Sequence, residues 1–148
     1  MKEELTRGQM EDHERLVDIW ERAVRATHHF LQEADIVFYR DLVRDHALHA
    51  VELWLARHED GHAVGFIGLD GPRIEMLFVD PNYRGRGIGS ALIRHAERLK
   101  GNCLQVDVNE QNEGACTFYA RYGFVACGRS EVDGSGRPFP LLHLQLRR

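Results

Sequence analysis

A glycine-rich segment in the middle of the chain limits the possible folds more than any other feature. It reads RGRGIGS at positions 84–90, follows an apolar run at 74–79 and opens a helical pattern of apolar residues. Glycine allows backbone conformations that point successive N–H groups into one concavity. The helix expected near Gly87 adds its positive N-terminal end, and Arg84 and Arg86 add full charges. The segment therefore predicts a strand, an anion-binding loop and a helix, in that order. The alternative is a tight, flexible turn that carries arginines.

Two familiar phosphate-binding loops fit this segment poorly. A Walker loop ends in Gly-Lys-Ser/Thr, and here no lysine precedes Ser90. A dinucleotide loop reads G-x-G-x-x-G directly after a strand, but Ser90 takes the place of the third glycine and residues 81–84 intervene. Asp107 lies at a tolerable distance for the acidic residue of that motif, yet antiparallel strands are expected before the loop. Both loops are therefore rejected.

The remaining pattern predicts a single α+β domain over residues 1–148. Asp-Gly pairs at 60–61 and 70–71 separate apolar runs, which is typical of antiparallel hairpins. We expect a mixed, mostly antiparallel sheet of six or seven strands flanked by about four helices. The expected strands cover residues 3–7, 51–56, 63–69, 74–79, 103–108, 124–132 and 139–146, and the helices cover about 10–26, 35–47, 87–100 and 115–122.

Composition narrows the class of protein and its setting. A chain of 148 residues has the size of one domain, and its net charge of −4 is unsuited to general nucleic-acid binding. No segment has the roughly 20 apolar residues of a membrane span, and the first twenty residues lack the apolar stretch of a secretory signal. Three cysteines without a close pair favour reduced thiols in the cytoplasm. The chain is expected to be a monomer or a homodimer.

Three segments together resemble the GNAT superfamily of acetyl-CoA-dependent N-acetyltransferases. Positions 84–89 are similar to its R/Q-x-x-G-x-G/A pattern, and the apolar strand at 74–79 precedes them as that family requires. Downstream, residues 112–124 resemble its N-x-x-A-x-x-F/L-Y-x-x-x-G-F segment. Residues 26–31 and 128–133 further resemble the bacterial YjaB-type subgroup. The resemblance implies the acyl-CoA N-acyltransferase fold, with acetyl-CoA as co-substrate and an amine as acceptor.

The resemblance also implies where the coenzyme binds. The pyrophosphate would lie at the glycine loop, and the pantetheine arm would lie along the preceding strand, where a main-chain N–H near 77–79 would meet the oxyanion. Asn112 is implied as a further contact, although it can equally cap the following helix. The expected contacts are Leu77, Phe78, Val79, Arg84, Gly85, Arg86, Gly87, Ile88, Gly89, Ser90, Asn112 and Tyr119.

Acyl transfer from a thioester to an amine needs a general base and a general acid. The family motif places Tyr119 as the acid, because a phenol has a higher pKa than a thiol and can protonate the leaving thiolate; the alternative is simple aromatic packing. Arg73 cannot be the base, since arginine does not deprotonate. Glu75 on the same strand is the first candidate base, and the alternative for it is a paired surface glutamate. His28 is the second candidate for a base or substrate role, and the alternative for it is a histidine that only packs or faces solvent. Acidic side chains that could attract a cationic amine are Glu33, Asp35, Glu131 and Asp133.

Two functions remain open at this stage. The first is an N-acetyltransferase that acts on a primary amine of a small molecule, a protein or a peptide. The second is a non-catalytic acyl-CoA sensor or interaction module, which Arg73 keeps open because it stands where a base is expected. No metal site is predicted, since His46 and His49 have no Cys or carboxylate at a recognisable zinc spacing.

Overall fold

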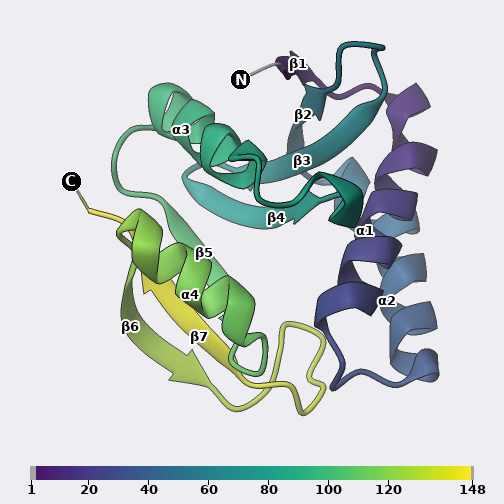
Figure 1. The fold of residues 1–148 in the computed structure, drawn as a ribbon. Helices are drawn as coiled ribbons and strands as arrows, with labels where there is room; N and C mark the ends of the chain where they lie inside the picture. The colour runs from purple at the N-terminus through teal and green to yellow at the C-terminus, as the bar shows by residue number, and fades with distance from the viewer. Residues whose placement is uncertain (1–2, 148) are drawn as a thin grey trace.

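The computed structural model describes residues 3–147 as one mixed sheet with helices on both sides (Figure 1). The sheet has seven strands in the order β1-β2-β3-β4-β5-β7-β6, which confirms the expected α+β class. The strands are β1 (Glu4–Arg7), β2 (Glu52–Arg57), β3 (Ala63–Asp70), β4 (Arg73–Val79), β5 (Gln105–Asn109), β6 (Val125–Ser130) and β7 (Leu141–Gln145). The helices are α1 (His13–Thr27), α2 (Glu33–Asp45), α3 (Ile88–Lys100) and α4 (Glu113–Tyr122).

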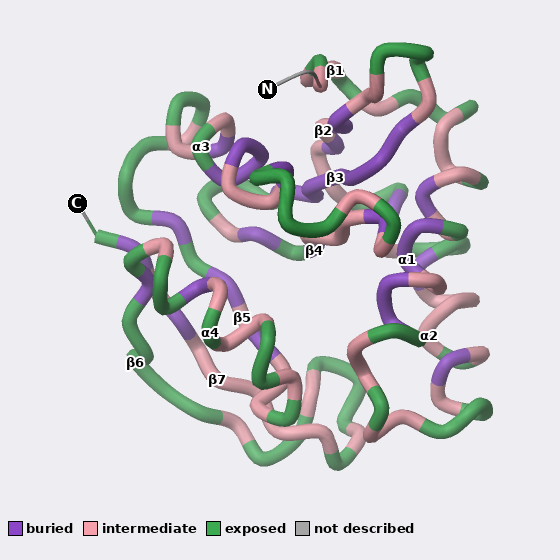
Figure 2. Tube along the Cα trace, in the orientation of Figure 1, coloured by how far each residue is buried: buried purple, intermediate pink, exposed green. Residues whose placement is uncertain are grey.

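Helices cover the sheet in two pairs. In Figure 1, α3 lies across the part of the sheet that contains β3 and β4, and α4 lies across β5 and β7. Helices α1 and α2 pack together on the other side of the β4 region. The buried apolar side chains form two clusters accordingly, one beneath α3 and α4 and one beneath α1 and α2. Figure 2 shows the purple buried residues along the inner strands and the inward sides of the helices.

The strand β4 leaves its neighbour β5 after a very short pairing. Within the described residues, the two strands run parallel and pair at Arg73 with Gln105 and at Ile74 with Val106. Beyond these pairs they diverge, as Figure 1 shows between the β4 and β5 halves of the sheet. The side of β4 that faces β5 is therefore open over residues 77–79, where the family resemblance implies a main-chain N–H for the oxyanion.

The predicted elements are confirmed, with two differences. The first helix begins as a 3-10 turn at Met10–Asp12 before the α-helix starts at His13. The last hairpin was expected to turn at 133–136, but β6 ends at Ser130 and β7 begins at Leu141. The longer loop arises because Asp133 accepts hydrogen bonds from the main-chain N–H groups of Ser135 and Arg137, which takes residues 131–140 out of the ladder.

The Asp-Gly pairs form the predicted hairpin turns. Gly61 and Gly71 have φ angles of +93° and +57°, a region that other residues rarely adopt.

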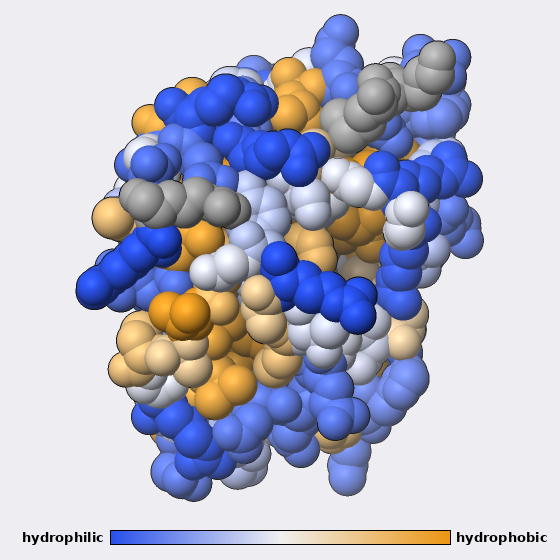
Figure 3. All heavy atoms as spheres, turned by 60° about the vertical axis from the view of Figure 1, so that its left-hand side comes forward, coloured by the Kyte–Doolittle hydropathy of each residue, from blue (hydrophilic) through white to orange (hydrophobic). Residues whose placement is uncertain are grey.

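Hydrophilic side chains cover most of the face drawn in Figure 3, and apolar ones gather in smaller groups. Among residues 3–147, none of the helices combines the length and apolar character that crossing a membrane requires.

Candidate active site

The glycine loop has the conformation that an anion site needs. Gly85 and Gly87 have φ angles of +74° and +79°, and Gly87 caps the N-terminus of α3. The first N–H groups of an α-helix have no acceptor within the helix, so those of α3 are available to a ligand. A Cβ atom at Gly89 would lie 3.2 Å from Cζ of Phe118 on α4. The loop therefore requires glycine for its turns and for its close approach to α4.

A cavity of about 600 Å³ runs from this loop along β4 to α4. Every expected coenzyme contact except Arg86 lines it. The Arg86 guanidinium packs instead over the ring of Tyr83, 4.9 Å from its centroid, and its coenzyme role stays a prediction. Residues that line the cavity and were not singled out from the sequence are Ala23, Thr27, Tyr83, Gly114, Ala115 and Phe118.

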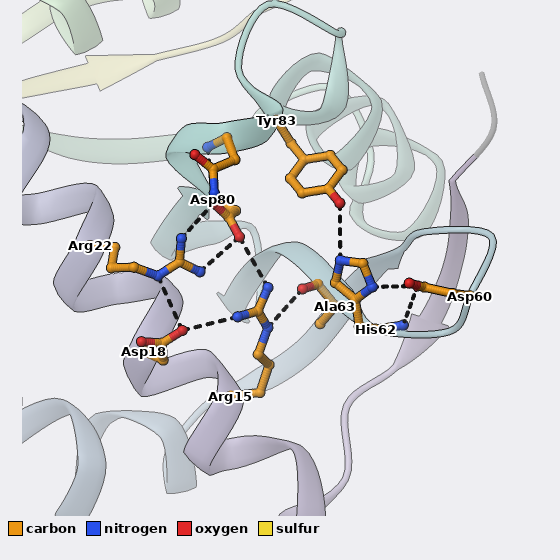
Figure 4. A network of polar contacts seen from close by, with 9 residues as sticks. Arg15, Asp18, Arg22, Asp60, His62, Ala63, Asp80 and Tyr83 are labelled. Carbon is orange, nitrogen blue, oxygen red and sulfur yellow. Dashed lines mark hydrogen bonds and ion pairs between the residues drawn. The ribbon is translucent and has the colours of Figure 1, made fainter.

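A polar network fixes the start of the loop to α1 (Figure 4). The Asp80 side chain, which is 2% exposed, accepts hydrogen bonds from both terminal nitrogens of Arg22 at 2.7 Å and from Arg15 at 3.0 Å. Burial opposes ionisation of Asp80, but the Arg22 hydrogen bonds and the Asn82 main-chain N–H outweigh it and lower its pKa to about 2. The loop thus leaves β4 from a fixed anionic anchor.

Tyr119 lies on α4 with its ring in the core and at the cavity wall. It is 6% exposed and packs edge-on against Phe118 and Phe124, with ring centroids 5.2 Å apart in each case. Burial raises the pKa of its phenol, so the hydroxyl stays protonated at neutral pH. Tyr119 therefore packs among aromatic side chains and also lines the first cavity, so the packing alternative does not remove it from the site. The Asn112 side chain likewise caps α4, accepting from the Ala115 N–H at 3.1 Å, and lines the same cavity.

A second cavity of about 360 Å³ lies between β4, α2 and the loop 131–140. Its wall is largely apolar, and three carboxylates line it: Glu75, Asp107 and Asp133. The loop is held against α2, because the Tyr39 hydroxyl donates to Asp133 and Arg137 Nη1 lies 2.9 Å from Asp35 Oδ1. The other two acidic candidates lie in exposed ion pairs, Glu33 with Arg25 and Glu131 with Arg129.

His28 lies where the two cavities adjoin. It lines both of them, and a small third cavity of about 110 Å³ between β4 and β5 brings it together with Glu75 and Tyr119. Burial, with a smaller contribution from His29, lowers the pKa of His28 to about 4. Its imidazole is therefore neutral at pH 7, and Nδ1 lies 2.8 Å from the Thr27 hydroxyl.

Glu75 shares a cation with a second carboxylate. Its Oε1 lies 2.7 Å from Arg73 Nε, and the other end of the same guanidinium contacts Asp107. The ladder between β3 and β4 shifts register opposite Glu75, between Gly68 and Leu69. Despite this bulge the Arg73 and Glu75 side chains meet on the same side of β4, at the second cavity.

Sequence reasoning did not place Asp107 at the second cavity, nor its contact with His143. They are directly paired across β5 and β7, and His143 Nδ1 lies 2.6 Å from Asp107 Oδ1. The available signal was their position between inward-facing apolar residues, Val106 and Val108 in one strand and Leu142 and Leu144 in the other. Within the described part of the chain, no group of three or more His, Cys, Asp or Glu side chains is placed to hold a metal ion.

These features define a class of protein: an acyltransferase in which an anion-binding loop and a cavity lined by carboxylates meet at the gap between two diverging strands. The family model described as an acetyltransferase (GNAT) domain matches residues 49–126. Peptidyl-lysine N-acetyltransferase YjaB of Escherichia coli (strain K12) is 45% identical over 140 residues, covering 95% of this chain and 94% of that protein. The chain belongs to the GNAT family and is an N-acetyltransferase, which favours the first of the two functions over the non-catalytic alternative.

Solved structures agree with this assignment. The solution structure of apo-form YjaB from Escherichia coli superposes with a TM-score of 0.90 at 44% identity, covering 99% of this chain and 98% of that one. The PaiA N-acetyltransferase of Thermoplasma acidophilum, solved in complex with coenzyme A, has a TM-score of 0.81 at 20% identity, with full coverage of both chains. The second likeness shows the fold, and the first confirms the resemblance to the YjaB subgroup.

Proposed function

We propose that this enzyme transfers the acetyl group of acetyl-CoA to the side-chain amine of a lysine in a peptide or protein. The observation that carries the proposal is the meeting of the two cavities at His28, with Glu75 on one side and Tyr119 on the other. A donor in the first cavity and an amine in the second would reach each other between β4 and β5.

The first cavity suits the coenzyme. The N–H groups at the start of α3 and the Arg84 side chain would hold the pyrophosphate, and the open side of β4 at 77–79 would pair with the pantetheine arm. The same part of the strand would offer a main-chain N–H to the oxyanion of the tetrahedral intermediate. The coenzyme A bound by the PaiA acetyltransferase supports this use of the fold.

The residues where the cavities meet have the chemistry for direct transfer. Glu75 would take a proton from the substrate ammonium, directly or through one water, and the neutral amine would attack the thioester carbon. Collapse of the intermediate breaks the carbon–sulfur bond, and Tyr119 would give its proton to the departing sulfur. The extra proton that remains on the amide nitrogen would then return to the Tyr119 phenolate. His28, neutral at pH 7, would orient the amine through a hydrogen bond.

The shape and charge of the second cavity support a lysine side chain as the acceptor. A lysine presents an apolar stem with a cation at its tip. The cavity offers apolar walls that include Leu31, Tyr39 and Phe139, together with the carboxylates of Glu75 and Asp107. The YjaB relative is named a peptidyl-lysine acetyltransferase, which supports the same class of acceptor.

The test measures release of free CoA thiol across a panel of acceptors. Lysine peptides with a blocked N-terminus are compared with free lysine, a polyamine and peptides whose single amine is the N-terminus. We expect the blocked lysine peptides to give the highest kcat/KM. Highest turnover of the polyamine or of N-terminal amines would overturn the proposed acceptor. The chain has two lysines, Lys2 and Lys100, which keeps self-acetylation easy to map.

Two variants test the proposed catalytic roles in the same assay. Tyr119→Phe and Glu75→Gln should each lower kcat by about 100-fold or more, the usual contribution of a general acid or base. Tyr122→Phe is the matched control, since it removes a phenol from the same helix whose hydroxyl contacts Glu97 on α3. Full turnover by either site variant would refute that residue's role.

We further propose that the enzyme works in the cytoplasm of a bacterium. Cys103, Cys116 and Cys127 are all unpaired, which fits a reducing compartment, and the YjaB relative is bacterial. The expectation of a monomer or homodimer, and of no nucleic-acid or membrane partner, stays a prediction.

A further inference from the structure

A line of polar contacts crosses four strands from the acceptor cavity to the sheet edge. Glu75 and Arg73 on β4 meet Asp107 on β5, and Asp107 meets His143 on β7 at 2.6 Å. The line ends where His143 Nε2 lies 2.7 Å from the Ser130 hydroxyl on β6. We call these five residues the β-sheet relay.

The His143 ring is held in a fixed place within the relay. Both ring nitrogens have partners, and the Cys127 thiol on β6 lies 3.3 Å from the main-chain oxygen of His143. A Cβ atom at Gly128, the residue opposite, would lie 3.2 Å from His143 Cδ2, so glycine leaves the space for the ring. The ring therefore keeps its contact with Asp107 without help from a ligand.

Arg73 is the point at which the relay reaches the acceptor site. The Arg73 guanidinium forms ion pairs with both Asp107 and Glu75. A weaker ion pair with Asp107 therefore allows a stronger ion pair with Glu75. A carboxylate held closely by a cation is a weaker base, because the cation stabilises its charged form. The charge that Asp107 offers to Arg73 thus controls how readily Glu75 accepts a proton.

We propose that His143 is a positioning residue for acetyl transfer, which acts through Asp107 and Arg73 on the base Glu75. This inference rests on the role of Glu75 proposed above. A neutral His143 leaves the Asp107 charge free to hold Arg73. A protonated His143 pairs with Asp107 as an imidazolium, and Arg73 then turns its charge toward Glu75 and suppresses proton uptake.

An imidazole can be neutral or charged, so the relay couples the charge on His143 to acetyl transfer. The groups that face His143 are Asp107 on β5 and the Ser130 hydroxyl and Cys127 thiol on β6, with Arg73 and Glu75 beyond Asp107 on β4. The two carboxylates and one guanidinium leave the site with a net negative charge when His143 is neutral, which also favours an ammonium substrate.

Two substitutions of His143 separate charge from structure. His143→Asn keeps an amide near the position of Nδ1 but cannot become charged, whereas His143→Lys places a cation there at every pH of the assay. The measurement is kcat from pH 5.5 to 8.5 with a blocked lysine peptide, together with the Kd of CoA and the melting temperature of each variant. His46→Asn, which removes an exposed histidine at the end of α2, is the matched control.

We expect opposite effects from the two substitutions. His143→Asn should raise kcat at pH 6 relative to the unaltered enzyme, whereas His143→Lys should lower kcat at pH 8. Each change should be about fivefold to tenfold, the size of one neighbouring charge acting on a titrating group. If the kcat–pH profiles of both variants keep the shape of the unaltered enzyme's profile, His143 is only structural, even where the overall kcat differs.

A second measurement needs no variant. In NMR spectra of the unaltered chain, the Arg73 Nε–H resonance should shift in step with the His143 imidazole between pH 5 and 8. An Arg73 signal that does not move while His143 titrates overturns the relay, even if Glu75 is the base. Conversely, full turnover by Glu75→Gln with coupled Arg73 and His143 signals would refute the proposed base and leave the relay standing.

Discussion

Both terminal nitrogens of the Arg22 guanidinium donate to the carboxylate of Asp80 at 2.7 Å, which ties α1 to the residue that follows β4. The glycine loop follows Asp80 after a 3-10 turn at Pro81–Tyr83, so its position depends on an ion pair formed outside the first cavity. A carboxylate that is 2% exposed can remain charged there because it is fully hydrogen-bonded.

The first prediction concerns this anchor. Asp80→Asn should lower the free energy of unfolding at pH 7 by about 2 kcal/mol, the value of lowering the carboxyl pKa from 3.8 to about 2. Because the folded pKa is the lower one, this stabilisation is complete above pH 3.8 and is lost as pH falls toward 2. Urea unfolding measures it, and CoA affinity should fall in parallel.

The matched control for the anchor is Asp18→Asn. Asp18 contacts the same two arginines, at 2.9 Å from Arg15 and 3.1 Å from Arg22, but its side chain is 52% exposed. Exposed ion pairs contribute little, so its loss should cost less than about 1 kcal/mol. Equal losses from the two substitutions would contradict the role assigned to Asp80.

The second prediction concerns the turn that opens α3. Gly87→Ala should raise the Kd of CoA by about tenfold, because a left-handed conformation costs other residues 1–2 kcal/mol and the loop would relax away from it. Gly71→Ala is the control, since Gly71 also has a positive φ but lies in the β3–β4 turn. Both variants should lose stability, and calorimetry should find weaker coenzyme binding in Gly87→Ala alone.

Local signals in the sequence were sufficient to predict the glycine loop and the hairpin turns. Gly61, Gly71, Gly85 and Gly87 all adopt positive φ angles, and the requirement for glycine at such positions is a property of one residue and its neighbours. The strand predicted over residues 103–108 is likewise present, as β5 at Gln105–Asn109.

The polar contacts of the site could not be predicted in the same way. Asp80 and Arg22 are 58 positions apart, and Tyr39 and Asp133 are 94 apart. Each pair depends on how a helix packs against a strand or a loop. Asp107 and His143 meet because of the exact register between β5 and β7, and a shift of one residue would turn one of them to the other face.

The third prediction concerns the loop that closes the acceptor cavity. Tyr39→Phe removes the hydroxyl that donates to Asp133 and should loosen residues 131–140 from α2. The KM for a lysine peptide should rise about threefold to tenfold, the value of one ordinary intramolecular hydrogen bond. The Kd of CoA should stay unchanged, because Tyr39 lines the acceptor cavity and not the coenzyme cavity.

The matched control for Tyr39→Phe is again Tyr122→Phe, which removes a hydroxyl that lies on α4 and contacts Glu97. Steady-state kinetics with varied peptide at saturating acetyl-CoA gives both constants for each variant. An unchanged peptide KM in Tyr39→Phe would mean that the contact with Asp133 does not shape the acceptor cavity. A matching rise in the Kd of CoA would mean that the substitution disturbs the whole site.

The fourth prediction concerns the stability cost of keeping His28 neutral. Its pKa is about 4 in the folded chain and 6.5 as a free side chain, so between these values the unfolded chain binds more protons. Stability must then fall as pH drops from 6.5 to 4, by an amount on the order of 3 kcal/mol. His28→Gln should remove that part of the decline.

The measurement is urea unfolding from pH 7 to pH 4.5, with exposed His46→Gln as control. Parallel declines in the His28 variant and the unaltered chain would show that His28 is not the group that resists protonation.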